Sequence, residues 1–154
     1  MPRNIFLIFI GTLFLIADQA IKFFLIHSLK ANETIPVIKN IFHITLIFNT
    51  GCAFGLLKDQ PSLFFLIISL TAIILLIYFF SRFKDGDVFY KLAAILLIAG
   101  SASNLIDRLR FGYVVDFLDF RIWPVFNLGD SAITIGVILF MYLLLRSKKS
   151  KVKR

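Results

Sequence analysis

Apolar residues fall into four long blocks along the chain, at about residues 5–29, 62–80, 90–106 and 131–145. The second block carries no charge, and the formal charges in the first are those of Asp18 and Lys22. A helix rises about 1.5 Å per residue, so a block of about 20 residues crosses a hydrocarbon core of about 30 Å. The first block exceeds the hydrophobic region of a secretion signal and further blocks follow it, which favours a membrane helix. The pattern therefore predicts four transmembrane helices.

The two longest connections between these blocks are residues 30–60 and 108–129. Apolar and polar residues alternate around Ile35–Phe48, which predicts short strands half-embedded at the membrane surface. We find no internal repeat, and 154 residues suffice for one domain. The expected fold is an all-α membrane protein, a single domain over residues 1–154, with a small β-containing segment between its first two helices.

Composition agrees with a membrane location and suggests an orientation. The chain is 59% hydrophobic, with 19 phenylalanines and a mean hydropathy of +0.90. Its net charge of +8 owes much to a basic tail at residues 146–154, which has no aromatic residue and follows a hydrophobic helix, so we do not expect nucleic-acid binding. Basic residues accumulate on the cytoplasmic side of membrane proteins. We therefore expect both termini in the cytoplasm and the two long connections at the outer face of the membrane.

The chain has few residues suited to metal binding. Cys52 is the only cysteine, which excludes an intrachain disulfide and a cysteine-rich metal site. His27 and His43 lack the spacing of zinc ligands. We predict neither a metal nor a cofactor.

Polar side chains within the predicted spans are costly in lipid and mark a candidate site. With a rise of about 1.5 Å per residue, Asp18 lies about 20 Å and Asn104 about 18 Å into the core, both in its outer half. Asp130 begins the fourth predicted helix at the outer face, and Asp116 lies in the connection before it. We expect these four side chains to converge at one depth, between the helices.

Two of these groups have simpler structural interpretations. Asp18 and Lys22 have the i, i+4 spacing of a helical ion pair, which favours a supporting role. Asp107 and Arg108 follow Asn104 on one helix face, and for Asp107 we favour a role in ending the helix at the membrane surface.

The remaining acids suggest chemistry when they are considered together. Asp130 alone would be a helix N-cap, and Asp116 alone an acid in an extended apolar segment. The two histidines and the one cysteine of the chain offer no plausible base or nucleophile. Asp116 and Asp130, taken as a pair, are therefore the leading candidates for acid and base catalysis. Asp119 is a rival that spacing does not exclude. A class-different alternative is a small ion- or proton-coupled transporter or channel, with Asp18, Lys22 and Asp116 along its path.

Five motifs in the chain resemble those of the lipoprotein signal peptidases, also called signal peptidase II. They occur in the family's order and together span nearly the whole chain: Asp18–Lys22, Asn49–Gly55, Asn104–Arg108, Gly112–Phe117 and Phe126–Ser131. Three small-for-small departures occur, at Cys52 and Gly129, where the family usually has alanine, and at residues 100–103, where it is commonly richer in glycine. Small residues in such places suit close helix packing.

The resemblance implies an aspartic endopeptidase of the bacterial inner membrane. In this family the enzyme removes the signal peptide of a prolipoprotein just before a diacylglyceryl-modified cysteine, and it is associated with inhibitors of the globomycin type. The resemblance implies Asp116 and Asp130 as the catalytic dyad, and we expect a monomer. The implied binding and supporting residues are Asn49, Gly51, Asn104, Arg108, Asn127, Gly129, Asp18 and Lys22.

Overall fold

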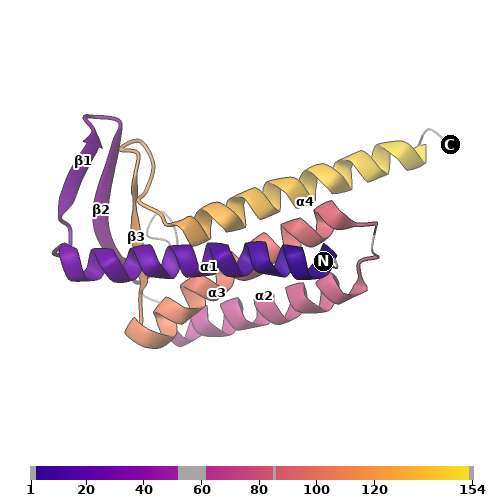
Figure 1. Ribbon diagram of the computed structural model, residues 1–154, viewed down its shortest axis with the longest axis horizontal. Coiled ribbons are helices and arrows are strands. Elements are labelled where there is room, and N and C mark those ends of the chain that lie inside the picture. Colours follow the sequence, from indigo (N-terminus) through magenta and orange to yellow (C-terminus); the bar gives the residue numbers. More distant parts are fainter. Residues whose placement is uncertain (1–2, 52–61, 85, 153–154) are drawn as a thin grey trace.

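The computed structural model describes residues 3–51, 62–84 and 86–152 and consists of a helical bundle with a small sheet at one end (Figure 1). In chain order the elements are α1 (Arg3–Ser28), β1 (Thr34–Ile38), β2 (Phe42–Asn49), α2 (Ser62–Arg82), α3 (Val88–Phe111), β3 (Val114–Asp119) and α4 (Leu128–Val152). All four helices are long and apolar enough to cross a membrane. The expected class, an all-α membrane protein with a small β segment, is confirmed.

Two helices extend beyond the ends predicted from hydrophobicity. Helix α3 continues past residue 106 to Phe111 and ends at Gly112, whose φ of 79° is left-handed and whose N–H donates to the carbonyl of Arg108. Helix α4 begins at Leu128 rather than near 131 and continues to Val152, through the segment predicted as a tail. Hydrophobicity locates the lipid-facing part of a helix, whereas capping and hydrogen bonding determine its ends.

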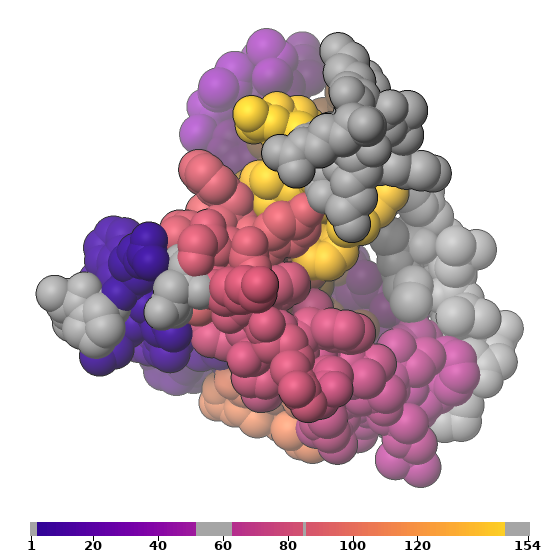
Figure 2. Space-filling view, turned by 90° about the vertical axis from the view of Figure 1, so that its right-hand side faces the viewer, coloured from indigo at the N-terminus to yellow at the C-terminus, as the bar shows by residue number. Residues whose placement is uncertain are grey.

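Helix α3 lies at the centre of the bundle. Seen from the end opposite the sheet, the start of α3, in rose, lies between α1, in indigo, and α4, in yellow (Figure 2). Its approach to α4 depends on glycine, because a Cβ atom on Gly100 would collide with the carbonyl oxygen of Gly129. Helix α2 instead exposes large apolar side chains along much of its length, as a helix facing lipid does.

The sheet has three antiparallel strands in the order β1-β2-β3. Strands β1 and β2 form a hairpin where the sequence predicts short strands. The third strand, which the sequence did not predict as part of the sheet, comes from the connection between α3 and α4 and pairs with β2. Leu25 of α1 packs against Leu46, Val115 and Phe117 of the sheet, which fixes β3 against the bundle. Asp116, between these last two, is thereby held at the junction of helices and sheet.

Candidate active site

Helix α4 begins with a reciprocal capping arrangement. The Asn127 side-chain oxygen accepts the Asp130 N–H at 2.8 Å, and Asp130 Oδ2 accepts the Asn127 N–H at 3.3 Å. Such a capping box satisfies N–H groups that the first turn of a helix leaves without partners. The sequence prediction that Asp130 caps this helix is therefore wrong: Asn127 is the cap, and Asp130 lies three residues later, held by it.

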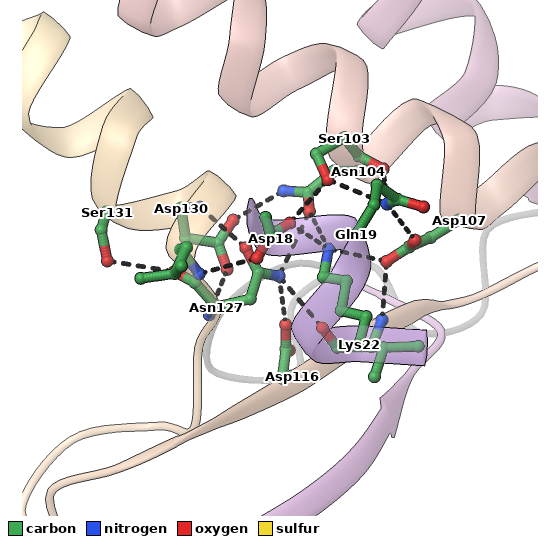
Figure 3. Close-up of polar contacts among 12 residues, drawn as sticks. Asp18, Gln19, Lys22, Ser103, Asn104, Asp107, Asp116, Asn127, Asp130 and Ser131 are labelled. Carbon is green, nitrogen blue, oxygen red and sulfur yellow. Dashed lines mark hydrogen bonds and ion pairs between the residues drawn. The ribbon is translucent and has the colours of Figure 1, made fainter. Parts of the chain in front are cut away.

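Three asparagines, Asn49, Asn104 and Asn127, hydrogen-bond to Asp116 or Asp130 and bring them into one site. Figure 3 shows Asn104 and Asn127 with the two acids. Asn127 Nδ2 donates to Asp116 Oδ1 at 2.7 Å, and Asn49 Nδ2 donates to Asp116 Oδ2 at 2.8 Å. Asn104 Nδ2 donates to Asp130 Oδ1 at 2.7 Å. Because Asn127 holds Asp116 through its amide and Asp130 through its backbone, it fixes the two carboxyl groups relative to each other.

Burial changes the acidity of Asp116, which is 1% exposed. Loss of solvent, and to a lesser extent the negative charge of Asp130, raise the pKa of Asp116 to about 7. The hydrogen bonds from Asn49 and Asn127 and the positive charge of Lys22 act in the opposite direction and are weaker than the burial effect. A carboxyl group with such a pKa exchanges its proton near neutral pH, as acid–base catalysis requires.

A buried ammonium group supports the site from the side of α1. Lys22 Nζ lies 2.8 Å from Asp18 Oδ2 and 2.7 Å from Asp107 Oδ2, and it donates to Asn104 Oδ1 at 3.2 Å. The Asp18–Lys22 ion pair predicted from spacing is present. Asp107, which we interpreted as ending α3 at the membrane surface, is instead fully buried and paired with Lys22. Because α3 continues past residue 106 to Phe111, Asp107 lies within the helix and is buried in the bundle.

The two carboxylates bound to Lys22 each hold a backbone N–H next to the candidate acids. Asp18 Oδ1 accepts the Leu128 N–H at 3.0 Å, two residues before Asp130. Asp107 Oδ2 accepts the Val115 N–H at 3.1 Å, one residue before Asp116. The ion-pair cluster therefore positions the backbone from which both carboxyl groups project.

Two further polar residues belong to this cluster and were not among the residues predicted for the site. Gln19 Nε2 donates to Asp107 Oδ1 at 2.8 Å and to the Ser103 hydroxyl at 2.9 Å. Ser103 donates to Asp18 Oδ2 at 2.6 Å. The sequence signals were the amide beside Asp18 in an apolar block and a serine in a stretch otherwise suited to glycine.

The other predicted site residues occupy different places. The Gly51 N–H donates to Asn49 Oδ1 at 3.0 Å, which leaves the Asn49 NH₂ group for Asp116. A Cβ atom on Gly129 would lie 3.0 Å from Asn127 Oδ1 and 3.3 Å from Asn104 Oδ1. The absence of a side chain at Gly129 therefore lets the start of α4 lie close to these two side-chain amides. The Arg108 guanidinium lies over the ring of Phe65 of α2, 5.3 Å from its centroid. Cys52 lies outside the described residues.

Asp119 has a different environment at the far end of β3. It accepts from the Thr45 hydroxyl at 2.7 Å and from the backbone N–H and guanidinium of Arg121 at 2.8 and 2.9 Å. Although burial acts to raise the pKa of Asp119, these hydrogen bonds and the charge of Arg121 outweigh it and lower that pKa. This residue is satisfied as a carboxylate and is not a partner for Asp130.

Fold and site together define a polytopic membrane protein with a paired-carboxyl site between its helices and its sheet, suited to proton transfer. Within the described residues, no three histidine, cysteine or acidic side chains are grouped to hold a metal ion. A family model described as signal peptidase (SPase) II matches residues 10–146. The chain belongs to the signal peptidase II family.

Individual relatives agree with this assignment. The chain is similar to the lipoprotein signal peptidase of Halothermothrix orenii, at 45% identity over 88% of this chain and 92% of the relative. It is likewise similar to the lipoprotein signal peptidase of Moorella thermoacetica, at 46% identity over 88% of this chain and 90% of the relative. A bacterial membrane enzyme solved by the in meso method at 2.3 Å superposes with a TM-score of 0.89 at 38% identity, covering 94% of this chain and 90% of that one. The transporter or channel alternative receives no support.

Proposed function

We propose that this protein is an aspartic endopeptidase that removes the signal peptide from prolipoproteins, with Asp116 and Asp130 as its catalytic dyad. The observation that carries the proposal is the shared asparagine cradle, in which Asn127 binds both acids and Asn49 and Asn104 each bind one. Membership of the signal peptidase II family supports the proposed reaction, and the hydrogen bonds of the cradle support the choice of Asp116 and Asp130 as its catalytic residues.

The two carboxyl groups share one proton near neutral pH, because adjacent like charges in a buried site do not both ionise readily. The ionised group removes a proton from a water molecule as its oxygen attacks the scissile carbonyl. The protonated group donates to the carbonyl oxygen and the tetrahedral intermediate forms. The C–N bond then breaks, the leaving amine takes a proton from the dyad, and one water has been added across the peptide bond. The amides of the cradle hold both carboxyl groups in place throughout.

The substrate we propose is a diacylglyceryl-modified prolipoprotein, cleaved on the N-terminal side of its lipidated cysteine. A lipid-modified peptide would reach the bundle laterally from the bilayer. The candidate site lies where the helices meet the sheet, and the sheet is at one end of the bundle (Figure 1). Arg108 and the amides are suited to bind the polar carbonyl groups of peptide or lipid. Inhibitors of the globomycin type would occupy the same site, and the enzyme would act as a monomer.

We further propose that the protein resides in the bacterial inner membrane with its site at the periplasmic face. The start of α1, the connection between α2 and α3 and the end of α4 lie at the end of the bundle opposite the sheet (Figure 1). These are also the places where basic residues accumulate, at Arg3, Arg82, Lys84 and residues 146–152. By the positive-inside rule that end faces the cytoplasm.

A direct test uses the purified, lipid-reconstituted protein with two versions of one precursor, one carrying the diacylglyceryl group and one without it. We expect mass spectrometry to find cleavage only in the lipidated precursor, immediately before the modified cysteine. Globomycin should block it, and Asp130→Asn should abolish it without loss of the folded protein. Equal cleavage of both precursors would contradict the substrate, and normal cleavage by Asp130→Asn would contradict the dyad.

A further inference from the structure

The Ser103 side chain is fully buried where α3 meets α1. Its hydroxyl hydrogen is donated to Asp18 Oδ2 at 2.6 Å, and its oxygen accepts from Gln19 Nε2 at 2.9 Å. Because a hydroxyl group is one donor and an acceptor, both functions are engaged. Gln19 therefore fixes the direction in which Ser103 points its hydrogen, toward Asp18.

Asp18 is the connection between this hydroxyl and α4. Its Oδ2 atom receives two donors, Ser103 from α3 and Lys22 from its own helix, and its Oδ1 atom receives the Leu128 N–H. Two donors from different helices fix the plane of a carboxylate, whereas a single flexible ammonium group permits it to rotate. With its plane fixed, Oδ1 is directed at the first residue of α4.

Leu128 lies inside the capping turn that carries the candidate acid. Asn127, immediately before it, exchanges two hydrogen bonds with Asp130. A shift of the Leu128 backbone is therefore passed to the whole capping turn and to the direction of the Asp130 carboxyl group. Misplacement of a reacting group by about 1 Å is enough to slow catalysis by up to about 100-fold.

We propose that Ser103 is a positioning residue for Asp130 and acts through Asp18. The inference rests on the proposed role of Asp130 in the dyad. Because Ser103 is buried and its hydroxyl is engaged by Gln19 and Asp18, we expect its effect to fall on the chemical step and not on substrate binding. Among the departures from the family pattern, Ser103 therefore adds a hydrogen bond to the support of the site.

The test compares Ser103→Ala with Ser101→Ala in the full-length, reconstituted protein. Ser101 is on the same helix, is partly buried and makes no hydrogen bond with the described residues through its hydroxyl, so it controls for loss of a serine from α3. We expect Ser103→Ala to lower kcat about five- to tenfold with KM unchanged, which is the net effect of losing one typical hydrogen bond. Ser101→Ala should retain the wild-type kcat. Ser103→Cys keeps a weak donor and should recover part of the loss.

Two kinetic results would overturn the positioning role of Ser103. One is a kcat for Ser103→Ala equal to that of Ser101→Ala, and the other is a change confined to KM. A loss of activity that matches a loss of folded protein, measured by thermal unfolding, would also overturn it, because a purely structural role predicts that result and no recovery by Ser103→Cys. Asp130→Asn, assayed in parallel, separates the two levels of inference. If it is inactive and Ser103→Ala is normal, only the positioning role fails; if it is active, the dyad fails as well.

Discussion

Strand β3 carries two aspartates, Asp116 within it and Asp119 at its end, that lie three residues apart and have opposite properties. Asp116 is surrounded by neutral amides and lies next to a second carboxyl group, and burial raises its pKa to about 7. Asp119 binds a hydroxyl, a backbone N–H and a guanidinium, which lower its pKa despite burial. Both are buried acids on one strand, so neither burial nor residue type distinguishes a candidate catalyst. The charge and hydrogen-bond capacity of the neighbours do.

The largest expected difference is in activity. Asp116→Asn should lower the rate of prolipoprotein cleavage at least about 1,000-fold, because it removes a proton-transfer group. Asp119→Asn should leave the rate of the folded enzyme within about threefold, since a carboxylate bound by Thr45 and Arg121 has no role in the reaction. Single-turnover cleavage assays on equal amounts of folded protein measure both. Comparable losses of activity in the two variants would contradict the assignment of Asp116, and not Asp119, to the reaction.

The pH dependence of cleavage provides the next test. The dyad must retain one proton, and the Asp116 pKa of about 7 places its loss just above neutrality. We therefore expect kcat to fall as pH rises above about 7, approaching tenfold per pH unit. The Asp119→Asn enzyme should show the same profile as wild type. A profile that stays flat to pH 9, or one that moves with Asp119→Asn, would place the titrating group elsewhere.

Stability should respond to the two substitutions with opposite signs. A raised folded-state pKa means that the folded protein loses stability as pH rises from about 4 to about 7, where Asp116 ionises in its buried site. Asp116→Asn should therefore raise the unfolding temperature at pH 8, with the difference vanishing near pH 4. The lowered pKa of Asp119 has the reverse sign, and its ionised form stabilises the fold above its ordinary pKa. Asp119→Asn should cost about 1–3 kcal/mol at pH 8. Thermal unfolding in detergent at the two pH values tests both signs.

The smallest effect is expected from Arg121. Its guanidinium pairs with Asp119, but the side chain is 49% exposed, and an ion pair in such a place contributes about 0.2–1 kcal/mol. Arg121→Gln should lower stability by no more than this amount and should leave activity unchanged. Denaturant titration at low and high salt measures the pair, which should weaken as salt rises. A larger loss would indicate that the guanidinium, rather than the hydroxyl of Thr45, sets the environment of Asp119.

Sequence could predict features that repeat along the chain or recur at fixed spacing. The four spans, the short strand structure around residues 35–48 and the Asp18–Lys22 pair belong to this group. The place of Val114–Asp119 in the sheet could not be predicted, because its pairing with β2 is a contact between distant parts of the chain that the local sequence pattern does not determine. The positions of Asp107 and Ser103 depend on how far α3 continues and on which face meets α1. Both facts come from contacts between helices, and hydrophobicity alone does not encode them.

Lys22 also has a consequence for how the protein is assembled. During synthesis α1 precedes α3, and at that stage Asp18 is the counter-ion available within its own helix, at 2.8 Å in the finished protein. An ion pair within one helix reduces the cost of carrying the charge into the bilayer. The other two partners, Asp107 and Asn104, arrive with α3. Sliding α1 along its axis by one helical turn, about 5.4 Å, would separate the ammonium from both, so Lys22 sets the register in which the first and third helices dock.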